Sequence, residues 1–183
     1  AEGVMGLFDG AINGTGSTAD AAALLGWPVV IIVDVKGQGA SAAAVVEGLA
    51  RHRKDIAVGA VIFNRVGSER HRKMLETAIA PTGIPCLGYI PRSSELDLPS
   101  RHLGLVQARE HGDFQTWIDR AAGIVGTAID LDALSDLAVP GTLATSGSDT
   151  LPLPLLGKHI AIARDDAFAF TYPHILDVWK SAG

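Results

Sequence analysis

Apolar and polar positions follow two alternating periods along the first ninety residues, and this alternation predicts the fold. Three apolar runs of strand length occur, at residues 29–33, 58–63 and 84–90. Three segments with helical spacing alternate with them, at residues 17–25, 41–51 and 68–80. The first run is apolar on both faces, which is typical of a strand that helices cover on both sides. The order therefore predicts an α/β fold in which helices pack on both faces of a parallel sheet.

The pattern weakens in the C-terminal part of the chain. Apolar residues at helical spacing within 114–125 predict a helix that packs on the core, and Asp130 caps a short helix that ends at residue 138. Residues 140–154 are rich in Gly, Ser, Thr and Pro, which predicts a linker between domains. Two short elements are expected after the linker, a strand at 159–163 and a helix at 172–182.

Ligands of open parallel sheets bind beyond the carboxyl ends of the strands, so the residues that follow each apolar run are candidate site residues. They are Asp34 after the first run, Asn64 and Arg65 after the second, and Pro91 and Arg92 after the third. The Asn64 carboxamide carries a donor and an acceptor, and it either matches a purine edge or caps a turn. Pro91 and Arg92 either close the base pocket or form an exposed turn, whereas Asp34 is interpreted mainly as the cap of the next loop.

The first ten residues place two acids among small and flexible residues. Glu2 and Asp9 are surrounded by Gly3, Gly6 and Gly10, which allow the backbone to approach a ligand closely. Mg²⁺ binds one or two protein carboxylates together with phosphate oxygens, so this segment predicts a Mg²⁺–phosphate site at the end of a strand. The alternative is a Gly-rich turn with two solvated acids, because short motifs of this kind are common.

Ser17 and Thr18 open the first predicted helix, and two interpretations of them are compatible. Either side chain caps the helix, and the free N–H groups of a helix N-terminus bind a carboxylate or a phosphate. Residues 10–17 have a faint similarity to a phosphate-binding loop, but they lack its lysine, so we discard that match.

Five ordered motifs connect these features to one family. They are EGVMGLFDG at 2–10 with GSTA at 16–19, GAVIFNRV at 59–66, GYIPR at 88–92, LPSRHLGL at 98–105 and IAIARDDAFAFTY at 160–172. With these motifs the chain resembles the cobyrinic acid a,c-diamide synthase family of glutamine-dependent amidotransferases. The resemblance implies a P-loop NTPase-like fold, similar to dethiobiotin synthetase, and then the start of a class I glutamine amidotransferase domain. It places a partial synthetase domain at 1–138, a linker at 139–157 and the second domain at 158–183.

The resemblance also implies a reaction, in which two carboxylates of a corrin-type macrocycle are amidated in cobalamin biosynthesis with ATP, Mg²⁺ and glutamine. Its catalytic residues would be Glu2, which also holds the metal, and Asp9. The nucleotide would contact Asn64, Arg65, Pro91 and Arg92. The substrate would contact Gly6, Leu7, Ser17, Thr18, Arg101 and His102. A substrate with many carboxylates requires cations such as Arg101 and His102 at its rim. Arg70 and His71 are weaker candidates, because they also fit surface salt bridges.

Composition limits the remaining classes of function. The 183 residues are 48% hydrophobic and 19% charged, which is enough for one α/β core. A net charge of −5 without a Lys/Arg cluster argues against nucleic-acid binding, which depends on phosphate neutralisation. The longest apolar run, at 28–33, is far shorter than a membrane span of about 20 residues, so no membrane partner and a cytoplasmic location are expected. The oligomeric state stays open, with a homodimer as one option.

Two chemical groups of the family's mechanism do not occur within the 183 residues. There is no Gly-x-x-x-x-Gly-Lys-Ser/Thr motif, and the single cysteine, Cys86, falls inside a predicted strand, where packing is favoured over a role as glutaminase nucleophile. We therefore expect an inactive central piece of a longer enzyme. Cobyric acid synthase, dethiobiotin synthetase and a non-catalytic nucleotide-fold module are the alternatives, and His102 and the Leu-Phe-Asp-Gly sequence favour the diamide synthase.

Overall fold

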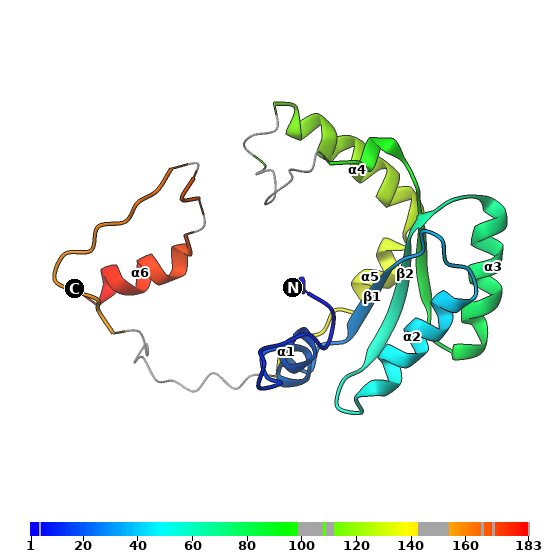
Figure 1. Cartoon of the computed structure of the whole chain (residues 1–183), viewed down its shortest axis with the longest axis horizontal. Helices are drawn as coiled ribbons and strands as arrows, with labels where there is room; N and C mark the ends of the chain where they lie inside the picture. Colours follow the sequence, from blue (N-terminus) through cyan, green and yellow to red (C-terminus); the bar gives the residue numbers. More distant parts are fainter. Residues whose placement is uncertain are drawn as a thin grey trace. The chain divides into compact units, whose positions relative to one another are not determined.

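The computed structural model describes residues 1–3, 5–98, 108, 112–142, 154–165, 167–169 and 171–182. The chain divides into two compact units, Ala1–Leu143 and Ala144–Gly183, and each is described by itself. The first unit contains the sheet and most of the helices, whereas the described part of the second contains a single helix (Figure 1).

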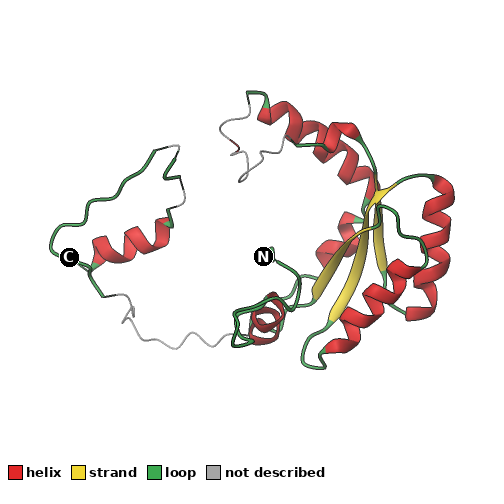
Figure 2. Cartoon of the chain, viewed as in Figure 1, coloured by secondary structure: helices red, strands yellow, loops and turns green. Residues whose placement is uncertain are grey.

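Three parallel strands form the sheet, in the order β1 (Val29–Asp34), β2 (Val58–Val66) and β3 (Cys86–Pro91) (Figure 2). The three apolar runs are therefore confirmed as strands, with small shifts at their ends. The register pairs Asp34 with Asn64 and Val66 with Pro91. Because all three strands run in one direction, their carboxyl ends meet at the same edge of the sheet.

Helices surround the strands, and several of their ends follow local capping signals. They are α1 (Thr18–Leu25), α2 (Ser41–His52), α3 (Glu69–Ile79), α4 (Phe114–Ala128) and α5 (Leu131–Asp136), with the short 3₁₀ turns η1 (Ala80–Thr82) and η2 (Ser94–Leu96). Ser17, Ser68 and Asp130 cap α1, α3 and α5, since each side chain accepts a hydrogen bond from a backbone N–H of the first turn. Gly26 ends α1 in the left-handed conformation. The caps predicted at Ser17 and Asp130 are confirmed.

Two apolar clusters cover the two faces of the sheet. Alternate residues of β2 point to opposite faces: Val61 and Phe63 pack with α2 and α3, whereas Ala60 and Ile62 pack with α4 and α5. Figure 1 shows α2 and α3 on one side of the sheet and α5 on the other. The prediction of helices on both faces is confirmed for β2. It is wrong for Ile32 of β1, which is 64% exposed because α4 and α5 pack mainly over β2 and β3.

One predicted strand, at 159–163, is not a strand in the structure. The described residues before α1 form turns and loops. Residues 159–163 are irregular as well, because a strand needs a neighbour for its hydrogen bonds and no described segment of the second unit pairs with them. The helix predicted after them is confirmed as α6 (Pro173–Ser181). No helix in the described ranges has the length and apolar character that crossing a bilayer requires.

An ion-pair network connects α1 to the segment after α2. Asp20 and Ser17 form a capping box, in which Ser17 Oγ accepts from Asp20 N at 3.1 Å and Asp20 Oδ2 accepts from Ser17 N at 3.0 Å. Arg53 donates to Asp20 Oδ1 and to Asp55 Oδ2, both at 2.5 Å. The hydrogen bond from Arg53, followed by those of Ser17, lowers the pKa of Asp20 to about 2. The Arg53 hydrogen bond also lowers the pKa of Asp55.

We expect this network to stabilise the chain above pH 4 and to lose its effect as the pH falls toward 2. The folded chain lowers the pKa of Asp20 from 3.8 to about 2, so protonation of Asp20 removes the stabilisation across that interval. Asp20→Asn keeps an acceptor for the helix cap but has no charge. Urea unfolding followed by circular dichroism should find this variant less stable than the unaltered chain near pH 6 and equal to it near pH 2.

Asp132→Asn provides the matched control, because Asp132 is an exposed acid in the first turn of another helix, α5. This variant should follow the unaltered chain at both pH values. The prediction would be contradicted if the stability difference between Asp20→Asn and the unaltered chain stayed constant down to pH 2. The charge of Asp20 would then contribute nothing to the stability of the fold.

Candidate functional site

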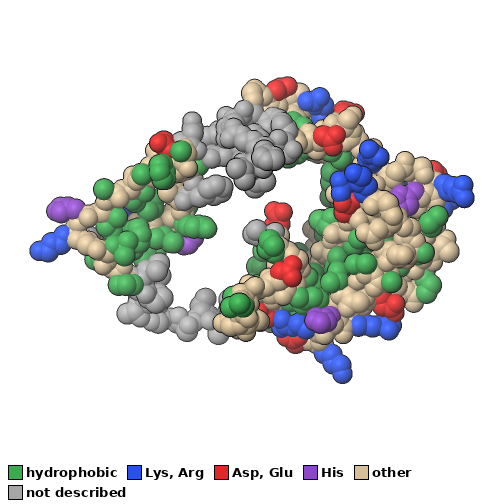
Figure 3. All heavy atoms as spheres, viewed as in Figure 1, with side chains coloured by type: hydrophobic (Ala, Val, Ile, Leu, Met, Phe, Trp, Pro, Cys, Tyr) green, Lys and Arg blue, Asp and Glu red, His purple; other side chains and the backbone are tan. Residues whose placement is uncertain are grey.

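A cavity of about 660 Å³ lies beyond the carboxyl ends of β2 and β3. It is lined by all four residues that were assigned to the nucleotide: Asn64, Arg65, Pro91 and Arg92. Figure 3 shows basic and acidic side chains close together at this end of the sheet. The structure therefore brings the four residues together, as the rule for parallel sheets predicts, whereas their contacts with a nucleotide stay a prediction.

Asp34 and Arg65 form an ion pair across the ends of β1 and β2. Arg65 Nε donates to Asp34 Oδ1 at 2.7 Å, and Arg65 Nη2 pairs with Asp34 Oδ2. Asp34 Oδ1 also accepts from Lys36 N at 3.0 Å, which confirms Asp34 as the cap of its loop. Sequence analysis missed the ion pair, because 31 residues separate its members and strand register alone brings them together.

Arg65 also has an unusual backbone conformation. Its φ is 62°, and no other non-glycine residue in the described part of the chain has a positive φ. This conformation costs a non-glycine residue about 1–2 kcal/mol, whereas an exposed ion pair contributes about 0–1 kcal/mol. Both side chains of the pair are exposed, by 46% for Arg65 and 45% for Asp34. Strain that the local contacts do not offset is typical of functional positions.

Further residues that line the same cavity include Lys36, Asp97 and Trp117. Trp117 was expected to be a core residue, but it is only half-buried, because α4 reaches beyond the sheet to the 3₁₀ turn η2. Its indole Nε1 is buried and has no hydrogen-bond partner among the described residues. Neither the helical spacing nor the residue type could have indicated this position, since both fit a core side chain equally well.

The acids at the start of the chain line a different cavity, of about 450 Å³, beside the start of β1. Glu2 and Asp9 meet Ser17 and Thr18 there. Asp9 Oδ2 accepts a hydrogen bond from Gly6 N at 3.0 Å. The cavity that Asn64 lines does not include Glu2, so the structure separates the acids from the base-contact residues. The two acids lie in turns and loops beside the start of β1, whereas Asn64 lies near the end of β2.

The N-terminus of α1, where an anion was expected, already binds protein acceptors. Ala19 N donates to Leu7 O at 2.9 Å, and Asp20 N donates to Ser17 Oγ at 3.1 Å. These bonds explain how Leu7 and Ser17 hold the first loop against the helix. An anion at Ser17 and Thr18 would therefore have fewer N–H donors than an uncapped helix offers.

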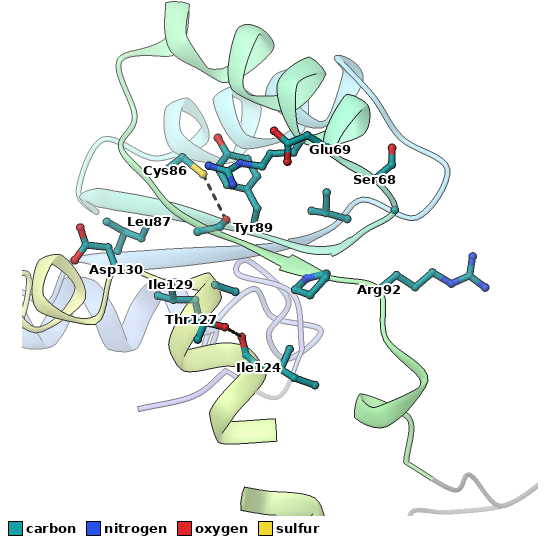
Figure 4. Close-up of a pocket in the computed structure, with 16 residues that line it drawn as sticks. Ser68, Glu69, Cys86, Leu87, Tyr89, Arg92, Ile124, Thr127, Ile129 and Asp130 are labelled. Carbon is teal, nitrogen blue, oxygen red and sulfur yellow. Dashed lines mark hydrogen bonds between the residues drawn. The ribbon is translucent and has the colours of Figure 1, made fainter. Parts of the chain in front are cut away.

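A larger cavity, of about 820 Å³, runs beside β3 between α3 and α4 (Figure 4). Some of its polar groups already have partners within the chain. Arg72 donates to Glu76 at 2.8 Å and lies 5.1 Å above the Tyr89 ring, and Thr127 Oγ1 donates to Ile124 O at 3.0 Å. Burial, and then a hydrogen bond with Cys86, raises the pKa of Tyr89. Of the four residues that were assigned to the nucleotide, only Pro91 and Arg92 line this cavity, so we place the candidate site in the cavity that all four line.

The structure describes only some of the cationic residues that were predicted to bind the substrate. Arg101 and His102 lie outside the described residues, so the structure says nothing about them. His71 has both ring nitrogens in use, since Nδ1 accepts from Gly67 N at 3.1 Å and Nε2 lies 2.6 Å from Gln38 O. The ring therefore connects the loops after β1 and β2, and this structural role replaces the weaker suggestion that His71 is a substrate cation. The described residues contain no cluster of three His, Cys, Asp or Glu side chains that could hold a metal.

The chain is similar to one family of domains over part of its length and to several known proteins over all of it. Residues 7–106 match the model of the CobQ/CobB/MinD/ParA nucleotide binding domain. The chain is 50% identical over 183 residues to a hydrogenobyrinate a,c-diamide synthase of Brucella anthropi. Proteins of the same name in Rhizobium meliloti and Rhodobacter capsulatus are 48% and 45% identical, over 182 and 186 residues. Each comparison covers 100% of this chain and 42% of the relative. No solved structure matches the chain.

Proposed function

We propose, from the premise that this chain belongs to the CobQ/CobB/MinD/ParA nucleotide-binding domain family, that it forms part of a hydrogenobyrinate a,c-diamide synthase. The observation that carries the proposal is the 50% identity, over all 183 residues, to a protein of that name. The chain spans 42% of the length of that relative, so the reaction is assigned to a longer enzyme that contains this chain. The relative's name favours the metal-free macrocycle as substrate over the cobalt-containing one.

In the proposed reaction a side-chain carboxylate takes the γ-phosphoryl group of ATP, which gives an acyl phosphate and ADP. Ammonia from glutamine then displaces the phosphate and leaves an amide. The first step is necessary because a free carboxylate is a poor electrophile. We assign the adenine to the cavity lined by Asn64, Arg65, Pro91 and Arg92, where a carboxamide and two cations lie together.

Two carboxylates fit a Mg²⁺ site, and Glu2 and Asp9 line one cavity. We assign the metal to Glu2, whose cavity would have to lie close to the phosphates of the nucleotide in the complete enzyme, where Mg²⁺ would supply charge stabilisation to the transferring phosphoryl group. Asp9 would orient the acceptor carboxylate or the ammonia. Gly6, Leu7, Ser17, Thr18, Arg101 and His102 are proposed to contact the macrocycle.

The remaining assignments are also proposals. A synthetase domain at 1–138, a linker at 139–157 and the start of a glutamine amidotransferase domain at 158–183 are consistent with ammonia delivery from glutamine. We infer that the 183 residues alone do not amidate, because they lack a Gly-x-x-x-x-Gly-Lys-Ser/Thr motif and their one cysteine, Cys86, lies within β3. A cytoplasmic location and a homodimer complete the proposal.

The proposal predicts that the complete enzyme converts hydrogenobyrinic acid to its a,c-diamide. Incubation with ATP, Mg²⁺ and glutamine should release two ADP per macrocycle, since each amide requires one acyl phosphate. Mass spectrometry should show two carboxylates replaced by amides. Omission of ATP provides the control and should leave the substrate unchanged. Unaltered hydrogenobyrinic acid in the complete mixture would contradict the proposed function.

A further inference from the structure

We propose that the Asp34–Arg65 ion pair positions the Asn64 carboxamide and thereby sets the preference of the cavity for adenine over guanine. This inference rests on the proposed function, since it assumes that the cavity holds a purine nucleotide. Arg65 lines the cavity that we assign to the adenine, but its guanidinium pairs with Asp34, so in this proposal neither residue contacts the base. They act as positioning residues, through the backbone between Arg65 and Asn64.

The ion pair fixes Arg65 from outside its own strand. Asp34 ends β1, and its register partner on β2 is Asn64, the residue before Arg65. The guanidinium reaches back across this register, with Nε on Oδ1 at 2.7 Å and Nη2 on Oδ2. A two-point contact of this kind holds the plane of the guanidinium as well as its position. Val35 N also donates to Asn64 O at 2.9 Å, which joins the two strand ends.

Asp34 is itself held in place. Its Oδ1 accepts from Lys36 N at 3.0 Å, and its carbonyl oxygen accepts from Gln38 Nε2 at 3.2 Å. The loop that follows β1 therefore holds the Asp34 carboxylate in place, and this carboxylate in turn holds Arg65. Because the Asp34–Arg65 pair is exposed, it contributes little to the stability of the fold. Its two-point geometry is the property on which the proposal depends.

The backbone of Arg65 transmits this constraint to Asn64. Arg65 N donates to Asn64 Oδ1 at 2.9 Å, and the Cα next to this N–H is the one that the ion pair holds in its unusual φ of 62°. Because an N–H group donates to an acceptor, this bond is made by the oxygen of the carboxamide and not by its nitrogen. The bond also opposes rotation of the carboxamide by half a turn. One lone pair of Oδ1 and both N–H groups of Nδ2 are left for other partners. Asn64 thus presents an acceptor and a donor in one fixed order.

A fixed order of acceptor and donor on Asn64 distinguishes adenine from guanine. Adenine carries the N6 donor where guanine carries the O6 acceptor, so one orientation of a carboxamide cannot satisfy both at that position. Without the bond from Arg65 N, the carboxamide can rotate and adapt to either base. Loss of the ion pair should therefore weaken discrimination between ATP and GTP, even though no group that faces the base has been removed.

The test measures kcat/KM of the complete enzyme for diamide formation with ATP and with GTP. Asn64→Ala should reduce the ATP-to-GTP ratio by roughly 10- to 100-fold, the discrimination that a two-point base contact provides. Asp34→Asn should reduce the ratio by at least about 10-fold, and it should have no further effect in a chain that already carries Asn64→Ala. Arg65→Lys, which keeps the charge but not the planar fork, is the second variant and should behave as Asp34→Asn does.

Asp55→Asn is the matched control, because Arg53 contacts Asp55 through the same two-point geometry away from the cavity. It should leave the ratio unchanged. An unchanged ratio in both Asp34→Asn and Arg65→Lys, while Asn64→Ala lowers it, would overturn the positioning role and leave the proposed function intact. Failure of the unaltered enzyme to form the diamide with any nucleotide would instead overturn the proposed function.

Discussion

Replacing Phe63 with alanine should lower the free energy of unfolding by about 3–5 kcal/mol, as for other buried aromatic residues. Phe63 is fully buried on the central strand β2, where it packs among α2 and α3 with its ring centroid 5.8 Å from that of Tyr89. The backbone of β2 is paired on both sides, so the sheet cannot collapse easily into the space that the ring leaves. Urea unfolding followed by circular dichroism measures the loss.

Ile32→Ala is the control for this prediction. Ile32 lies on the neighbouring strand β1, but its side chain is 64% exposed, so its truncation creates no cavity. Substitutions at such positions usually change stability by about 0.5 kcal/mol or less. If Ile32→Ala and Phe63→Ala cost the same, the Ile32 and Phe63 side chains would not differ in burial as described.

The second large effect is expected for Glu2→Gln in the complete enzyme, where diamide formation should fall by roughly 100-fold or more. A metal ion contributes several kcal/mol of charge stabilisation to phosphoryl transfer, and the amide of glutamine is a poorer Mg²⁺ ligand than a carboxylate. Glu2 is exposed in its cavity and outside the core, so the variant should fold normally. Rates measured over a range of Mg²⁺ concentrations would show whether higher Mg²⁺ partly restores turnover.

Glu47→Gln gives a matched control, because Glu47 is a surface acid on α2 that pairs with Arg51 and lines none of the three cavities. This variant should retain its activity and its dependence on Mg²⁺. Near-normal turnover of Glu2→Gln at every Mg²⁺ concentration would remove Glu2 from the metal site. Asp9 would then be the next carboxylate to replace, since it lines the same cavity.

Local chemistry was sufficient to predict most of the secondary structure. The β-branched run at 29–33, the cap at Ser17 and the stop at Gly26 are signals carried by adjacent residues, and the structure follows each of them. The carboxyl-edge rule also selected Asn64 and Arg92 correctly as residues of one cavity. These features depend on chain order and local conformation, which the sequence states directly.

The tertiary structure alone decided which distant groups meet. Strand register set Asp34 beside Arg65, whose N–H donates to Asn64 Oδ1. Helix placement left Ile32 exposed, although its run of residues was predicted to be covered on both faces. Glu2 lies in a separate cavity, beside the start of β1 and not at the carboxyl ends of the strands. Pairing and burial of this kind depend on contacts between segments far apart in sequence, and local propensity carries no information about such contacts.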